Sequence, residues 1–150
     1  MMPLGVPVDI TISEVLHEDP QPRVLVVGLD PYRLPGPWDP KPISDAIELG
    51  LARFAQHGVG VEACLVALDG SDDVEAVITE ALRTRSWECV VIGGGIRNDD
   101  ALELFERVLN LVHRCCPDTA IAFNTNPTDS FEAAARWLPT SDPDAQDQGH

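Results

Sequence analysis

Short apolar runs alternate along this chain with longer segments in which apolar residues recur every three or four positions. The runs cover residues 24–29, 61–68, 89–93 and 120–124. They are rich in aliphatic residues and lack a clean alternation of apolar and polar positions, which is typical of parallel strands covered on both faces. The pattern therefore predicts four buried strands.

Four further segments carry an apolar stripe with helical spacing, and each predicts a helix. The stripes consist of Ile43, Ala46, Ile47, Gly50, Leu51 and Phe54, then Val74, Val77, Ile78, Ala81 and Leu82, then Leu102, Phe105, Leu109 and Val112, and finally Phe131, Ala134, Ala135 and Leu138. Gly58 follows the first stripe as a helix stop. Asp72, Asp100 and Asp129 are each followed three residues later by a Glu, a pair that can cap the start of a helix.

Successive strand–helix–strand units require right-handed crossovers between parallel strands. We therefore expect a three-layer α/β fold, Rossmann-like or flavodoxin-like, with a four-stranded parallel core sheet in the order 2-1-3-4 and helices on both faces. Residues 23–138 form this single domain. In the preceding segment, 1–22, the alternation of Val8, Ile10 and Ile12 favours an additional edge strand. Residues 139–150 contain several acidic residues, and their one aliphatic side chain is an alanine. This composition predicts a disordered acidic tail.

The charge balance excludes some partners. With 25 acidic and 10 basic residues the formal net charge is −15, which repels phosphate backbones, and no basic stripe offsets it, so we expect no nucleic-acid partner. No apolar run approaches the roughly 18–20 residues that span a bilayer. The N-terminus lacks a basic region followed by an apolar one, so we expect a cytoplasmic protein.

The cysteines fit that location. Cys64 and Cys89 lie inside apolar runs, while Cys115 and Cys116 are adjacent and lack zinc-ligand spacing. We interpret all four as structural or surface thiols, with a redox role for the adjacent pair as the alternative.

Polar residues and glycines gather after the four predicted strands. In open parallel sheets, ligands bind outside the carboxyl ends of the strands, close to the point where strand order reverses. The alternative is that these residues are ordinary caps and turns, because helix starts select Asp, Asn and Ser whatever the function. The candidate site residues are Asp30, Tyr32 and Arg33, then Asp69 and Ser71, then Gly93, Gly94, Gly95, Arg97 and Asn98, and finally Asn124 and Asn126.

The glycine run 93–95 is the most specific of these features. It can bring main-chain N–H groups close to an anion, and Arg97 would add positive charge, so a phosphate or carboxylate would suit it. A dinucleotide fingerprint would need glycine where Asn98 stands, and the Lys of a P-loop is missing. The competing interpretation is a tight turn that lets the following helix pack close to the sheet.

The stretch GLDPYRLPG resembles the water-activating motif of uracil-DNA glycosylases, in which a strand ends in Gly-Gln-Asp-Pro-Tyr-His. The resemblance implies that Asp30 would position water and Tyr32 would wall the pocket. Leu29 replaces the glutamine, Arg33 replaces the histidine, and Asn126 stands where a second motif of the family has its catalytic histidine. The match covers under a tenth of the chain, so the sequence does not assign it to that family.

Four prolines, at positions 31, 35, 37 and 40, should make the loop 30–39 stiff. Tyr32 and Trp38 either flank a ligand there or anchor the loop by packing down. Asp30 is the candidate catalytic acid, and Asp30 with Asp69 supplies oxygen ligands that would suit magnesium. No cofactor is indicated by a motif.

Three classes of function remain from these observations. We favour a protein that binds an anionic or nucleotide-like small molecule at the carboxyl edge of the sheet. The alternatives are a small hydrolase-like enzyme that uses Asp30, with or without magnesium, and a non-catalytic interaction or structural protein.

The third helical segment also favours a homodimer, because its apolar stripe is wider than one sheet-facing surface needs; coverage by the N-terminal segment is the alternative. The residues of the wide stripe are Leu102, Leu104, Phe105, Val108, Leu109, Leu111 and Val112.

Overall fold

Four parallel strands form one sheet in the computed structural model, which describes residues 21–34, 36–98 and 102–139 of the chain. They are β1 (Pro22–Leu29), β2 (Gly60–Val66), β3 (Cys89–Ile92) and β4 (Ala120–Phe123). The order is β2-β1-β3-β4, and every neighbouring pair is parallel. The predicted order and direction are thus confirmed, although β2, β3 and β4 end one or two residues before the apolar runs do.

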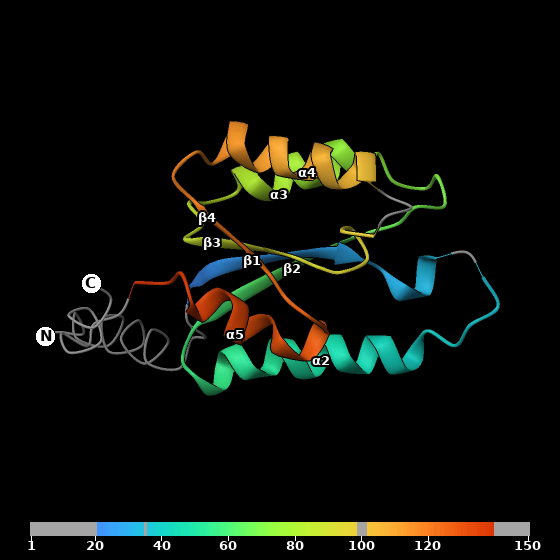
Figure 1. Ribbon diagram of the computed structural model, residues 1–150, viewed down its shortest axis with the longest axis horizontal. Helices are drawn as coiled ribbons and strands as arrows, with labels where there is room; N and C mark the ends of the chain where they lie inside the picture. Colours follow the sequence, from blue (N-terminus) through green and yellow to red (C-terminus); the bar gives the residue numbers. More distant parts are fainter. Residues whose placement is uncertain (1–20, 35, 99–101, 140–150) are drawn as a thin grey trace, which may run out of the picture.

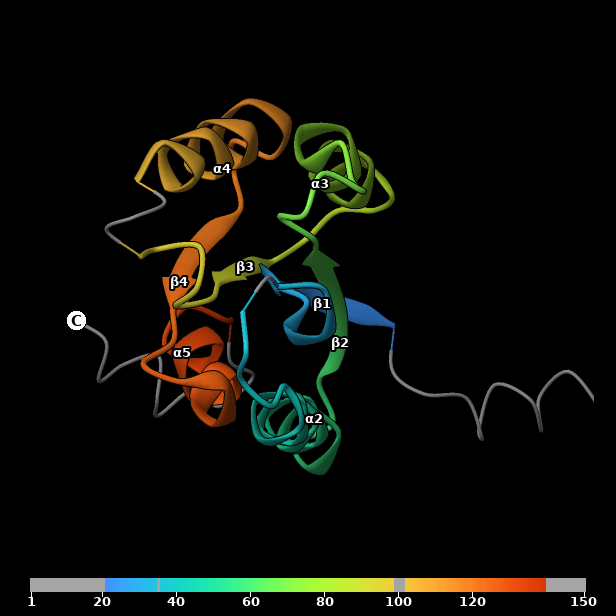
Figure 2. The same cartoon turned by 90° about the vertical axis from the view of Figure 1, so that its right-hand side faces the viewer.

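Helices cover both faces of this sheet. In the described residues the α-helices are α2 (Lys41–Gln56), α3 (Val74–Arg83), α4 (Leu102–Cys115) and α5 (Ser130–Ala135), and the short 3₁₀ turns are η1 (Pro31–Arg33) and η3 (Pro127–Asp129). α2 and α5 lie on one face and α3 and α4 on the other (Figures 1 and 2). The result is the predicted three-layer α/β fold. None of the helices in the described part of the chain is long and apolar enough to cross a membrane.

The central strand β1 contributes to two separate hydrophobic clusters. Leu25 and Val27 pack into the cluster beneath α3 and α4, and Val24 and Val26 pack into the one above α2 and α5. All four side chains are buried. Both faces of β1 are therefore core, which explains why its sequence does not alternate between apolar and polar residues.

The helix starts differ from the predicted Asp–Glu pairs. α3 is capped by Asp73, whose carboxylate accepts the main-chain N–H of Ala76 at 3.1 Å, and not by Asp72. Asp72 instead accepts the main-chain N–H of Ala67 at 2.9 Å, within the loop that precedes the helix. Asp129 makes no side-chain cap bond to α5. Asp100 lies outside the described residues.

The last stripe also differs from the predicted one at a single position. Ala133 and Ala134 are buried, whereas Ala135 is exposed. Phe131, Ala134 and Leu138 pack on the core as predicted, and Ala133 takes the place expected for Ala135.

Two glycines shape α2 and its surroundings. A β-carbon at Gly50 would lie 1.9 Å from the carbonyl oxygen of Pro127, so the glycine lets η3 approach the helix. Gly58 has φ +71° just after the helix ends, as its predicted role as a helix stop requires. The docking of η3 on α2 positions the loop that follows β4.

The remaining predictions about the chain ends concern residues that the structure does not describe. The edge strand expected around Val8, Ile10 and Ile12 lies in residues 1–20, and the tail lies in residues 140–150. Both stay predictions.

Candidate functional site

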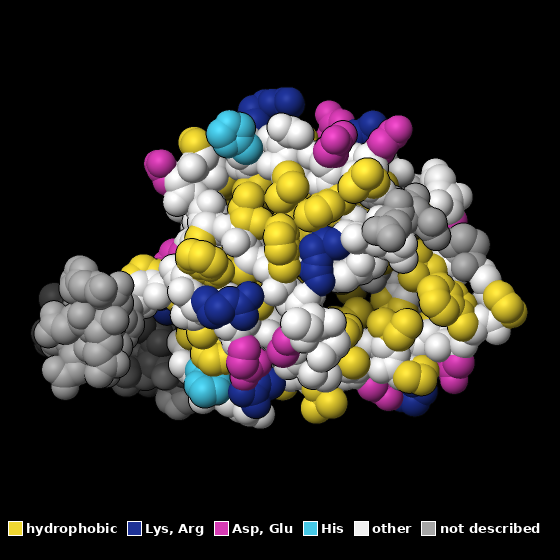
Figure 3. Space-filling view, in the orientation of Figure 1, with side chains coloured by type: hydrophobic (Ala, Val, Ile, Leu, Met, Phe, Trp, Pro, Cys, Tyr) yellow, Lys and Arg dark blue, Asp and Glu magenta, His cyan; other side chains and the backbone are white. Residues whose placement is uncertain are grey.

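The carboxyl ends of the four strands meet at one edge of the molecule, where their loops separate toward opposite layers. The loop after β1 leads to α2 on one face, and the loop after β3 leads to α4 on the other (Figure 1). Strand order therefore reverses between β1 and β3, and this is where open parallel sheets bind ligands. In the space-filling view the surface is hollowed near this edge, between the two helix layers (Figure 3).

Arg33, in the loop after β1, is held between two carboxylates. Its Nε donates to Asp30 Oδ2 at 2.9 Å, and its Nη1 donates to Asp72 Oδ1 at 3.2 Å. The hydrogen bonds that the guanidinium donates to Asp30, and then to Asp72, raise its pKa. The bond to Asp72 also ties the loop after β1 to the loop after β2.

Asp69 and Ser71 form a turn beside this cluster. The main-chain N–H of Ser71 donates to Asp69 Oδ1 at 2.9 Å, and the Ser71 hydroxyl donates to the same oxygen. These bonds from Ser71, with a smaller effect of the Arg33 charge, lower the pKa of Asp69. Asp69 repels the Asp72 carboxylate across the loop.

The β1–β2 half of the edge is thus acidic. Asp30 and Asp72 both pair with Arg33, whose guanidinium lies between them, and Asp69 lies beside this cluster. Among the described residues, no group of three or more His, Cys, Asp or Glu side chains is arranged to hold a metal. An anionic ligand would be repelled from this half.

Asp30 has structural partners for both carboxylate oxygens. Oδ1 accepts the main-chain N–H of Tyr32 at 2.9 Å and so begins η1, and Oδ2 receives Arg33. A role as a general base or in orienting water, as the glycosylase-like motif implies, would need one of these bonds to open. Arg33, which stands in place of the motif's histidine, is the group that occupies the carboxylate.

Arg97 dominates the other half of the edge. Its Nη1 donates to the carbonyl oxygen of Ile92 at 3.3 Å, and its Nη2 donates to the carbonyl oxygen of Asn124. The guanidinium lies over the ring of Phe123, 5.2 Å from the ring centre. Arg97 therefore joins the loop after β3 to the end of β4.

The charge of Arg97 is not cancelled by a direct carboxylate contact. No Asp or Glu in the described ranges lies within ion-pair distance of it. Burial lowers the pKa of the guanidinium, and the charge of Asp129 acts in the opposite direction. An arginine stays protonated at neutral pH even so. Arg97 thus presents a half-buried positive charge beside the glycine run.

The three glycines of this run serve different purposes. A β-carbon at Gly95 would lie 2.9 Å from Leu29 Cδ1, and one at Gly93 would lie 3.3 Å from the Val27 carbonyl oxygen, so both positions support the close-packing interpretation. At Gly94 the nearest atom would be Nη2 of Arg97 at 3.7 Å, an ordinary contact. Gly94 and Gly95 are both exposed, and Gly94 lies next to the guanidinium, so it is the glycine that an anion bound to Arg97 would approach. Asn98 is exposed at the end of the loop.

Asn124 is turned inward after β4. It is only 5% exposed. Its Nδ2 donates to the Ser130 hydroxyl at 3.0 Å, and that hydroxyl in turn donates to the carbonyl oxygen of Pro127 at 3.3 Å. Its Oδ1 is buried and has no hydrogen-bond partner in the described parts of the chain. This amide holds the start of α5 against the end of β4.

Asn126 is occupied by its own loop. Its Oδ1 accepts the main-chain N–H of Thr128 at 2.8 Å, and its own N–H donates to Asp129 Oδ1 at 3.2 Å. Burial alone would raise the pKa of Asp129, but hydrogen bonds from Thr125 and Asn126 outweigh it and lower that pKa. Arg136 donates to the Phe123 carbonyl oxygen at 3.1 Å. The described β3–β4 half therefore carries Arg97 and Arg136 against Asp129.

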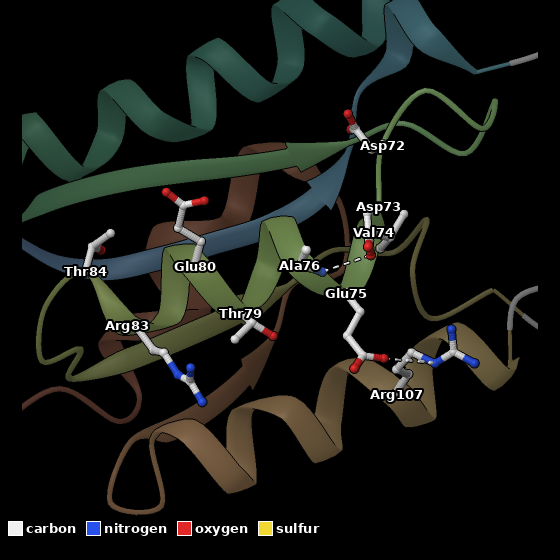
Figure 4. Close-up of a pocket in the computed structure, with 10 residues that line it drawn as sticks. All are labelled: Asp72, Asp73, Val74, Glu75, Ala76, Thr79, Glu80, Arg83, Thr84 and Arg107. Atoms are coloured by element: carbon white, nitrogen blue, oxygen red, sulfur yellow. Dashed lines mark hydrogen bonds and ion pairs between the residues drawn. The ribbon is translucent and has the colours of Figure 1, made fainter.

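A separate groove of about 1040 Å³ runs along α3 and faces α4. Glu80 and Arg83, which line it, project from opposite sides of α3, and the Glu75–Arg107 ion pair is long at 3.9 Å (Figure 4). Its side chains belong to the outer surfaces of the helices and do not converge on one point. One end of this groove reaches Asp72 and Asp73 in the loop after β2, and the rest runs along α3 away from the strand ends.

The cysteines do not contribute to the edge. Burial raises the pKa values of Cys64 and Cys89 to about 11, so both thiols stay protonated at neutral pH. Cys115 and Cys116 lie at the end of α4, and both line a pocket of about 530 Å³ there.

The structure divides the predicted site. It brings Asp30, Arg33 and Asp69 together on one side, with Asp72 as an additional member, and Arg97 and Asn124 on the other. Asp72 was predicted only as a helix cap, and Ser130, which receives the Asn124 amide, had no place in the predicted site. The sequence offered one signal for this role of Asp72: Asp72 and Asp73 are adjacent, and only one of them is needed to cap α3. The sequence matches no protein-family model and no curated protein.

Proposed function

We propose that this protein binds a small molecule through an anionic group at the carboxyl edge of its sheet, in the space where the loops after β1 and β3 separate. A phosphate or carboxylate group would lie against Gly94 and Arg97. The strand order supports this place, because the reversal between β1 and β3 leaves the two loops on opposite layers.

The observation that carries the proposal is the environment of Arg97. Its guanidinium is bonded to neutral carbonyl oxygens and, within the described residues, to no carboxylate. A half-buried cation of this kind favours an incoming anion, because it gains a charge-assisted hydrogen bond without having to break an ion pair. The acidic cluster around Arg33 excludes the same anion from the neighbouring half of the edge.

Catalysis by Asp30 has less support than binding. Both of its oxygens accept hydrogen bonds that hold η1 in place. These contacts of Asp30 support no reaction, with or without magnesium. We therefore propose binding and do not propose a reaction.

A thermal-shift screen tests the proposal. The panel is inorganic phosphate, ribose 5-phosphate, adenosine 5′-monophosphate (AMP), flavin mononucleotide (FMN) and citrate, each at millimolar concentration. A ligand that binds the native state raises the melting temperature by mass action. We expect at least one compound to do so in the native protein and to lose its effect in Arg97→Ala. A melting temperature that no compound raises would contradict the proposal and favour a non-catalytic interaction protein.

We also propose that two copies of the chain associate through a patch on α4 and β4. Leu102 is 60% exposed and Phe123 is 42% exposed. The Phe105 and Phe123 rings are in edge-to-face contact, 5.6 Å apart, so the patch is continuous from the helix to the strand. Hydrophobic side chains gather over this side of the molecule (Figure 3). A second copy would cover them.

A cytoplasmic location accompanies both proposals. It stays a prediction from the amino-terminal sequence and from cysteine usage.

A further inference from the structure

The start of the loop between β1 and α2 is fastened to the end of β2 and to the loop that follows it. The main-chain N–H of Asp30 donates to the carbonyl oxygen of Val66 at 2.9 Å, and Arg33 spans from Asp30 to Asp72. At its far end, Asp39 accepts the main-chain N–H of Lys41 at 3.0 Å. Pro31, the first residue of η1, is buried. Such a loop loses little conformational freedom when a ligand binds to it.

This fastened loop exposes both of its aromatic side chains. Tyr32 is 61% exposed and Trp38 is 54% exposed. A β-carbon at Gly36, whose φ is +135°, would lie 3.1 Å from Trp38 Nε1, so the glycine makes room for the indole ring. Neither ring serves as an anchor that packs the loop down, which was one of the two predicted roles.

The loop begins next to the glycine run. Leu29, the last residue of β1, packs against Gly95 so closely that a β-carbon there would lie 2.9 Å from Leu29 Cδ1. Exposed hydrophobic side chains gather at this end of the molecule, over the loop and the start of α2 (Figure 3). The aromatic pair therefore belongs to the same edge as Arg97, on the opposite side of the point where strand order reverses.

We infer that Tyr32 and Trp38 stack against a planar ring of the ligand whose anionic group lies at Arg97. The inference rests on the proposed function and narrows the ligand to a mononucleotide-like compound, in which one molecule carries a ring and a phosphate. Every planar ring offers a face for stacking, so the aromatic side chains need no matched hydrogen bonds to accept it. The charged end of the ligand avoids the acids around Arg33, and the uncharged ring is the part that passes close to them.

Calorimetric titration of the full chain with AMP, FMN and ribose 5-phosphate tests whether a planar ring contributes to the affinity of the ligand. Ribose 5-phosphate carries the anionic group without a base. We expect AMP or FMN to bind at least about tenfold more tightly than ribose 5-phosphate, in line with the usual gain from stacking a base on an aromatic side chain.

Two substitutions locate the effect. Trp38→Ala should weaken binding of the better nucleotide by roughly 5- to 150-fold and leave ribose 5-phosphate unchanged, whereas Trp137→Ala, at an exposed indole after α5, should change neither. Tyr32→Ala should act in the same direction as Trp38→Ala. The melting temperature of each variant shows whether it folds.

The outcomes separate this inference from the proposed function. If all three compounds bind with equal affinity and depend on Arg97, the ring inference fails and anion binding stands. If Trp38→Ala and Tyr32→Ala both leave nucleotide affinity unchanged, the aromatic pair is not the ring site, and its exposure favours a protein partner. If none of the three binds, the ring inference fails together with phosphate binding.

Discussion

Arg97 donates a hydrogen bond from its guanidinium to the main-chain carbonyl oxygen of Asn124. A second bond reaches the carbonyl of Ile92 at 3.3 Å, so one side chain closes the loop after β3 onto the ends of both β3 and β4. Main-chain carbonyls orient the guanidinium without neutralising it. Arg97 therefore holds the loop in place while its positive charge stays without a carboxylate partner in the described residues. Both the stability and the ligand affinity of each Arg97 variant must therefore be measured.

Gly50 should be the most sensitive position of α2. A β-carbon there would meet the Pro127 carbonyl at 1.9 Å, so η3 must move. We expect Gly50→Ala to lower the free energy of unfolding by about 1–3 kcal/mol, despite a gain of about 1 kcal/mol in helix propensity. Urea denaturation measures the change, and Glu48→Ala on the exposed side of the same helix should stay within about 0.5 kcal/mol of the parent. A more stable Gly50→Ala variant would disprove the close contact.

Gly94 and Gly95 should respond differently to the same substitution. Gly95→Ala must displace Leu29 Cδ1, which would lie 2.9 Å away, whereas the nearest atom at Gly94 would be 3.7 Å away. We expect Gly95→Ala to cost about 1 kcal/mol or more and Gly94→Ala to stay within about 0.5 kcal/mol of the parent. The two melting curves provide the comparison, and equal destabilisation would argue against distinct roles for the two glycines.

Asp72 should make stability depend on pH. The hydrogen bond from the Ala67 N–H, and then the bond from Arg33, hold the pKa of this carboxyl below its usual value. A group with a lowered folded-state pKa contributes fully above its unfolded pKa of about 3.9, and the contribution is lost as the pH falls through the folded value.

The variant Asp72→Asn tests this dependence. It should be less stable than the parent near neutral pH, and the difference should shrink below about pH 4. Urea denaturation across this range measures it. A difference that stayed constant down to about pH 3 would mean that the charge of Asp72 is not what stabilises the loops.

Self-association should be visible in solution. Multi-angle light scattering is expected to return twice the chain mass of 16.3 kDa. Leu102→Glu, in the α4–β4 patch, should restore the single-chain mass, whereas Leu49→Glu, at an exposed position of α2, should not. A single-chain mass for the parent protein at micromolar concentration would remove the proposed dimer.

Much of the fold could be predicted because its determinants are local. β1 and β3 are buried on both faces, so their aliphatic runs carry no alternation, and parallel strands joined by helices allow few arrangements. The helix starts were harder to place. Asp72 and Asp73 are the same residue type in adjacent positions, and only the tertiary contacts to Ala67 and Arg33 show that the second one caps α3.

The location of the candidate site stays a prediction, and the division of the carboxyl edge into two halves was not predicted. Asp30 and Arg33 follow β1 and Asp72 follows β2, and the ion pairs that Arg33 makes with both acids depend on loop geometry that no spacing reveals. Arg97 and Asn124 were both expected near the ligand, but the bond between them joins a side chain to a main-chain carbonyl, which sequence patterns do not encode. The exposure of Trp38 likewise depends on the conformation of Gly36.

The affinity of the most tightly bound anion of the screening panel, compared between the parent and Arg97→Ala, tests the central claim most directly. Arg107→Ala, which removes a surface arginine in a 3.9 Å ion pair on α4, controls for the loss of one positive charge. Arg97→Lys keeps the charge while giving up the planar fork, and melting temperatures report the folding of each variant. Binding at Arg97 predicts that Arg97→Ala loses roughly 10- to 150-fold in affinity, the equivalent of about 1.5–3 kcal/mol for a charge-assisted hydrogen bond, with Arg97→Lys in between and Arg107→Ala unchanged. A folded Arg97→Ala variant that binds the same anion as tightly as the parent would contradict the claim.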